Sequence, residues 1–144
     1  MDDRDREERA FQVSPLALAY VGDAVWELAV RQMLVERGER RPRRLHGMAV
    51  RYVQAGGQAD RLSRVFPLLT EREQSVVMRG RNAKSASVPR SATVGEYRLS
   101  TGLEALLGYL YLSGKRERLD EMMGVLLSET PAIKRDGASG TPEQ

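Results

Sequence analysis

Two segments of the chain are apolar on nearly every side, and they limit the fold more than any other feature of the sequence. The first runs from Leu16 to Gly38 and the second from Leu99 to Leu112. At about 100° per residue, their apolar side chains surround a helix and leave hardly any polar face. Such a helix belongs in the middle of a domain. No strand-like alternation of useful length occurs, so the sequence predicts an all-α fold, a compact helical bundle around these two helices.

Local signals predict where helices begin and end. Ser14 followed by Pro15 is a typical start, and Thr70 with Glu73 has the form of a capping box. One folded domain is expected over residues 14–128, with disordered segments at 1–13 and 129–144. Besides the two apolar helices, the sequence indicates helices over 43–55, 58–65, 70–79 and 116–127 and an exposed loop over 81–94.

Composition excludes several classes of protein. The chain has 144 residues, no cysteine and one histidine, His46, which rules out disulfides, thiolate chemistry and multi-histidine metal sites. No apolar run reaches the roughly 20 residues of a membrane-spanning helix, and the first nine residues mix acids with bases, unlike a signal peptide. We therefore expect a cytoplasmic protein without a membrane partner.

Each apolar helix carries an acid in its interior. Asp23 lies in the first, four residues before Glu27, and Glu104 is the single acid of the second. A buried carboxylate is costly unless it is paired, hydrogen-bonded or bound to a metal. Two such helices could hold Mg²⁺, which prefers oxygen ligands and needs only one or two carboxylates. Two structural alternatives remain open: a capping box formed by Thr101 and Glu104, and an ion pair of Asp23 with an arginine such as Arg31.

The residues around the two acids resemble the ribonuclease III endonuclease domain. Residues 18–25, LAYVGDAV, are similar to its signature helix, and residues 104–112, EALLGYLYL, to its second acidic helix. The segment RGRNAK, residues 79–84, lies between them. The resemblance extends from Leu16 to Met123 and is closest to the Mini-ribonucleases III, a short bacterial branch without a separate double-stranded-RNA-binding domain.

This resemblance implies Mg²⁺-dependent hydrolysis of double-stranded RNA to 5′-phosphate and 3′-hydroxyl ends, with 23S ribosomal RNA precursor as the substrate. It assigns Asp23 and Glu104 as the catalytic and metal-binding residues. It also implies a homodimer built around the signature helix, where Gly22 and Ala19 would permit close approach. A ribosomal protein is a candidate partner that presents the substrate.

The chain departs from the wider family in its number of acids. Full-length ribonucleases III usually carry two further acids, at the positions held here by Ala19 and Thr101. A site built from four carboxylates is therefore not expected, and Glu27 could contribute only through a water molecule.

Basic residues are concentrated in two stretches. Residues 31–64 hold nine arginines against three acids, and residues 79–98 hold five bases against one. Such stretches suit a phosphate backbone, and duplex RNA is recognised mainly by shape, phosphates and 2′-hydroxyls. The expected RNA-binding residues are Arg79, Arg81, Asn82 and Lys84. The block at residues 40–44 can serve solubility alone, and His46 is expected on a helix surface or in helix packing.

Two other functions compete with a nuclease. One is a non-catalytic helical RNA-binding or ribosome-assembly module, against which the presence of both Asp23 and Glu104 argues. The other is a helical protein-interaction domain with an incidental arginine-rich surface. Metal-dependent cleavage of duplex RNA that is lost on Asp23→Asn substitution would exclude both.

Overall fold

The computed structural model describes residues 1–53, 55–84 and 93–128; for residues 53, 55–57 and 59 it describes the backbone alone. Over these residues the chain is helical and contains no strand, which confirms the predicted all-α class. The elements are α1 (Asp3–Gln12), α2 (Pro15–Glu36), α3 (Pro42–Val53), α4 (Ala55–Val65), the 3₁₀ turn η1 (Phe66–Leu68), α5 (Glu71–Asn82), α6 (Val94–Leu112) and α7 (Arg116–Leu127).

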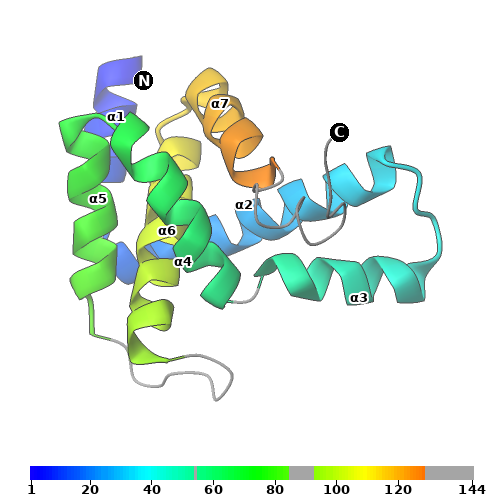
Figure 1. The fold of residues 1–144 in the computed structure, drawn as a ribbon. Helices are drawn as coiled ribbons and strands as arrows, with labels where there is room; N and C mark the ends of the chain where they lie inside the picture. The colour runs from blue at the N-terminus through cyan, green and yellow to red at the C-terminus, as the bar shows by residue number, and fades with distance from the viewer. Residues whose placement is uncertain (54, 85–92, 129–144) are drawn as a thin grey trace, which may run out of the picture.

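Helix α6 is the centre of the bundle. Helices α1, α2, α4, α5 and α7 all pack against it, and every residue from Ser100 to Leu110 is buried except Glu104. Figure 1 shows α2 crossing behind α6 and projecting away from it, with α3 alongside the projecting part. Residues 100–110 of α6 therefore have the central position that the sequence predicted, whereas Tyr111 is exposed.

Helix α2 is less buried than its sequence predicted. One side carries the core residues Leu18, Trp26, Val30 and Leu34. The other side leaves a stripe of apolar side chains exposed: Leu16, Tyr20, Leu28 and Val35. No single described helix has the length and hydropathy to span a membrane; α1 and α2 reach that threshold only together, across a bend of 112°.

Two glycines bring the backbones of α2 and α6 into direct contact. A Cβ placed on Gly22 would overlap the carbonyl oxygen of Glu104. A Cβ placed on Gly108 would overlap the carbonyl oxygen of Leu18. Neither position can carry a side chain unless a helix moves. The sequence analysis placed Gly22 and Ala19 at a contact between subunits, and this was wrong: Gly22 packs against α6 of its own chain, and Ala19 is buried as well.

The start of α6 corrects a second expectation. The helix begins at Val94, earlier than predicted, and Thr93 and Glu96 form its capping box. Thr101 and Glu104 lie two turns inside the helix, and the Thr101 hydroxyl donates to the Tyr97 carbonyl oxygen at 2.9 Å. A capping role for Glu104 is thereby excluded. The predicted start at Ser14 and the capping box of Thr70 with Glu73 are both confirmed.

The predicted disorder of residues 1–13 was also wrong. Residues 3–12 form α1, with Asp2 as its N-cap. Tyr109 of α6 donates to the carboxylate of Glu7, and Arg72 of α5 donates to that of Glu8. Charged residues that we expected to be exposed to solvent therefore bind residues far along the chain. The predicted tail at 129–144 and most of the predicted loop, residues 85–92, lie outside the described residues.

The glycine contact generates a stability prediction. Gly22→Ala and Gly108→Ala should each lower the free energy of unfolding by about 3 kcal/mol, because the new methyl group meets backbone that cannot yield locally. The matched control is Gly124→Ala in α7, where a Cβ would meet nothing within 4 Å. That change should stabilise the protein by about 0.5–1 kcal/mol, since alanine favours a helix over glycine. Urea unfolding measures all three, and equal effects would contradict the proposed contact.

Candidate active site

Asp23 and Glu104 meet where α2 crosses α6. Asp23 directly follows Gly22, which lies against the backbone of Glu104, and the two side chains are hydrogen-bonded to each other. The pKa of Glu104 is raised to about 8, first by burial and then by the hydrogen bond and negative charge of Asp23. Glu104 is partly buried, whereas Asp23 is exposed rather than buried as predicted. The acid pair thus opens to solvent on one side.

No ion pair of the described residues neutralises either acid. Arg31, which the sequence offered as a partner for Asp23, pairs instead with Glu27 at 2.8 Å. Two adjacent carboxylates repel each other when both are ionised, and the repulsion is strongest where water is excluded. A divalent cation would remove that repulsion. The donor set therefore fits Mg²⁺, which uses one or two carboxylates and fills its other positions with water or phosphate oxygens.

The structure brings together the two carboxylates that the sequence singled out, Asp23 and Glu104. Ala19 and Thr101, the positions at which the ribonuclease III resemblance led us to look for further acids, are both buried. The described residues contain no group of three or more acids or histidines that could hold a metal. Glu27 is bound to Arg31 and lines a groove between α2 and α3 together with His46. Its carboxylate is thus occupied by a neighbour on its own helix.

The end of α5 lies beside the turn of α6 that carries Glu104. A Cβ on Gly80 would be 2.9 Å from the Cβ of Ala105 and 3.0 Å from the carbonyl oxygen of Thr101. The next two residues, Arg81 and Asn82, are exposed and line a groove with Arg98 of α6. Three of the predicted RNA-binding residues, Arg81, Asn82 and Lys84, are therefore free to meet a ligand at this end of α5.

Arg79 does not join that exposed group. Its guanidinium donates to the carbonyl oxygens of Phe11 at 3.0 Å and Val13 at 3.2 Å. It also lies 5.1 Å from the centre of the Phe11 ring. Both donors face the junction of α1 and α2, so the structure gives Arg79 a different environment from the one the sequence suggested.

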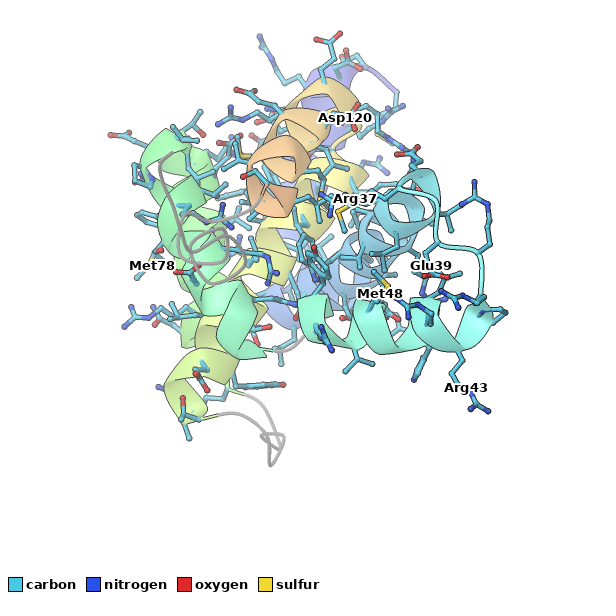
Figure 2. The ribbon with its side chains drawn as sticks, turned by 45° about the vertical axis from the view of Figure 1, so that its right-hand side comes forward. Arg37, Glu39, Arg43, Met48, Met78 and Asp120 are labelled. Atoms are coloured by element: carbon cyan, nitrogen blue, oxygen red, sulfur yellow. The ribbon has the colours of Figure 1, made fainter. Side chains whose placement is uncertain are left out.

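A second basic surface lies at the turn between α2 and α3. Figure 2 shows Arg43 extending from the start of α3, with Glu39 on the opposite side of that helix end. Glu39 binds the side chains of Arg41 and Arg44. The pKa of Glu39 is lowered to about 2, mainly by a hydrogen bond from the Arg41 backbone amide. One carboxylate thus organises an arginine-rich turn whose remaining side chains are exposed.

Sequence reasoning missed the exposure of Tyr20, whose side chain is 84% exposed one turn before Asp23. Periodicity marked it as part of a helix that is apolar on all sides but could not show which side the other helices cover. The sequence feature that could have predicted this exposure is the large apolar surface of the two segments. A chain of this size has too few helices to cover both segments completely.

Comparisons with known proteins show the family of this chain. A model of the ribonuclease III domain matches residues 16–115. The Mini-ribonuclease 3 of Symbiobacterium thermophilum is 57% identical over 109 residues, which cover 76% of this chain and 84% of the relative. That of Staphylococcus aureus is 35% identical over 128 residues, covering 88% and 96%.

A solved structure is also similar to this chain. The crystal structure of a protein from Fusobacterium nucleatum aligns with a TM-score of 0.72 and 33% sequence identity, covering 81% of this chain and 93% of that one. The region matched by the family model contains both acid-bearing helices and the contact between them. The chain therefore belongs to the ribonuclease III domain family, among the Mini-ribonucleases 3, and is an endoribonuclease of that type.

Proposed function

We propose that this endoribonuclease hydrolyses phosphodiester bonds of double-stranded RNA with Mg²⁺, leaving 5′-phosphate and 3′-hydroxyl ends. Asp23 and Glu104 are the proposed catalytic, metal-binding residues. The observation that carries the proposal is the contact between these two acids, which have no cationic partner among the described ion pairs. A purely structural role gives no reason to place two acids side by side without a cation, so a non-catalytic RNA-binding or assembly module is less consistent with the site.

The chain's own residues divide the chemistry between them. A bound Mg²⁺ would supply an activated water and stabilise negative charge on the phosphate. Asp23 and Glu104 would hold the ion at the crossing of α2 and α6. The chain has no cysteine, and His46 lies on the exposed side of α3, in the groove that Glu27 lines. Neither residue type is thus available at the acid pair as a nucleophile or general base.

The proposed RNA contacts lie at the end of α5. Arg81, Asn82 and Lys84 would bind phosphates close to the α6 turn that contains Glu104, in keeping with recognition of duplex RNA by backbone and shape. Resemblance to the Mini-ribonucleases 3 supports a duplex stem in the 23S ribosomal RNA precursor as the proposed biological substrate. A cytoplasmic location and presentation by a ribosomal protein belong to the same proposal.

We further propose that the enzyme acts as a homodimer through the exposed side of α2. Leu16, Tyr20 and Leu28 form an apolar stripe on the helix that also carries Asp23. Large contiguous apolar surfaces are typical of interfaces between proteins. A two-fold dimer through this stripe would place two acid pairs in one assembly, one for each strand of the duplex.

Removing either carboxylate tests the metal site. Asp23→Asn and Glu104→Gln should each slow Mg²⁺-dependent cleavage of a duplex RNA more than about a hundredfold, because each loses a charged metal ligand worth several kcal/mol. Both variants should keep the helical circular dichroism of the parent. The matched control Glu27→Gln, on the same helix as Asp23, should cleave at close to the parental rate. Cleavage that survives EDTA or the Asp23→Asn change would contradict the proposal.

The raised pKa of Glu104 predicts how stability depends on pH without metal. Between about pH 4.5 and 8 the folded chain retains a proton that the unfolded chain releases, so this group's contribution to stability falls as pH rises through that window. Above pH 8 the contribution is lost. Glu104→Gln cannot ionise and lacks this decline.

Denaturant unfolding in EDTA at pH 5.5, 7.0 and 8.5 checks the sign. The stability of Glu104→Gln relative to the parent should increase across the series. Adding Mg²⁺ at pH 8.5 should stabilise the parent and leave the variant nearly unchanged. A difference that stays constant with pH would show that burial does not raise the pKa of Glu104.

The dimer proposal predicts a change in mass. Tyr20→Glu places a charge in the centre of the apolar stripe and should convert a dimer to a monomer in analytical ultracentrifugation. Leu68→Glu, at a residue of η1 that is 52% exposed, is the matched control and should leave the mass unchanged. A parent protein that is already monomeric at micromolar concentration, or a dimeric Tyr20→Glu variant, would refute this interface.

A further inference from the structure

Arg79 ties the end of α5 to the chain segment that leads into α2. Its two donors bind the carbonyl oxygens of Phe11 and Val13. Val13 immediately precedes Ser14, the N-cap of the helix that carries Asp23. The contact spans 68 residues of sequence at Phe11 and 66 at Val13. One guanidinium therefore connects the basic end of α5 to the C-terminal end of α1, directly before the helix that carries Asp23.

Phe11 reinforces this connection. Two guanidinium groups of α5 lie over its ring, that of Arg72 at 4.0 Å from the ring centre and that of Arg79 at 5.1 Å. The Tyr109 ring of α6 meets its edge at 6.2 Å. Cation–π contacts of this kind contribute most where the groups lose water. Helix α1, which precedes the residues matched by the family model, thus holds both α5 and α6.

The other side of α5 is fixed at the same level. Gly80, next to Arg79, packs closely on Thr101, Gly102 and Ala105 of α6. The last turn of α5 is therefore held between α6 on one side and the α1–α2 junction on the other. Arg81 and Asn82 follow at once and are exposed.

We propose that Arg79 is a positioning residue which, with Phe11, holds Arg81 and Asn82 in place next to the α6 turn that contains Glu104 before RNA binds. This inference rests on the proposed function, because it takes Arg81 and Asn82 as phosphate contacts. Arg79 itself touches no RNA. It keeps the end of α5 ordered in the free protein, so no binding free energy is lost in ordering these residues when RNA binds.

Positioning and direct contact differ in how RNA affinity depends on salt. Each phosphate that a protein neutralises adds about 0.7–0.9 to the slope of log affinity against log salt concentration. Losing a direct contact lowers that slope. Losing a positioning contact leaves the same phosphates bound in the complex, so affinity falls by one factor at every salt concentration and the slope is unchanged.

The experiment measures binding of a duplex RNA oligonucleotide in EDTA between 50 and 200 mM salt. Arg79→Met should weaken binding roughly three- to tenfold at every salt concentration, in keeping with the loss of two hydrogen bonds, without a change in slope. Arg81→Met should weaken binding and reduce the slope by about one phosphate. Phe11→Leu changes no charge and should behave like Arg79→Met, and it serves where the arginine variant folds poorly.

Three further measurements separate positioning from general loss of stability. With Mg²⁺ present, Arg79→Met should raise KM and leave kcat at saturating RNA and Mg²⁺ affinity within about twofold of the parent. Arg79→Lys keeps the charge but cannot bind two carbonyl groups in the same way, so it should remain impaired. The double variant Arg79→Met, Phe11→Leu should be no weaker than the more affected single variant, because both remove one connection.

Each result bears on a separate claim. A reduced salt slope in Arg79→Met, or full affinity in Arg79→Lys, would make Arg79 a direct RNA contact and overturn the positioning role. Unchanged affinity in both Arg79→Met and Phe11→Leu would overturn it as well. If Arg81→Met binds RNA as the parent does, the proposed RNA surface fails, and the positioning role fails with it.

Discussion

The backbones of α2 and α6 touch at Gly22 and Gly108, and the rest of the site depends on this contact. Helices with ordinary side chains at the crossing stay 8–10 Å apart, whereas glycine removes the atoms that would separate them. Asp23 directly follows Gly22, and Gly22 packs against the carbonyl oxygen of Glu104. The same packing that closes the core therefore brings two carboxylates from distant parts of the chain into hydrogen-bond contact.

The contact between Glu104 and Asp23 destabilises the fold at one point of α6, whose neighbouring residues are apolar and buried. Glu104 interrupts a continuous buried run in α6, and its ionisation is resisted both by burial and by the charge of Asp23. A perturbed acid of this kind, without a cationic partner in the described ion pairs, is typical of a functional site rather than of a structural one. By contrast, the buried acid Glu73 is paired: it accepts two hydrogen bonds from Arg118, and its pKa is lowered.

The arginines of the chain fall into two groups that their sequence context does not separate. Arg79 and Arg72 bind α1 and serve the architecture, whereas Arg81, only two residues beyond Arg79, faces solvent. The difference follows from helix geometry, since residues two apart point in different directions. A segment whose charge suggests RNA binding can therefore contain both a solvent-exposed arginine and one that binds the protein's own backbone.

The sequence by itself determined the helical class, most helix ends and the two acids, because these depend on short-range periodicity, capping residues and a local motif. Tertiary structure decided everything that involves partners far along the chain: that Gly22 meets α6 of its own subunit, that Asp23 and Tyr20 are exposed, that Arg79 turns inward and that the charged N-terminus folds as α1. The apolar residues of a helix determine how much of its surface must be buried. Which side is buried is fixed only when the other helices pack against it, and a charged side chain gains its partner in the same step.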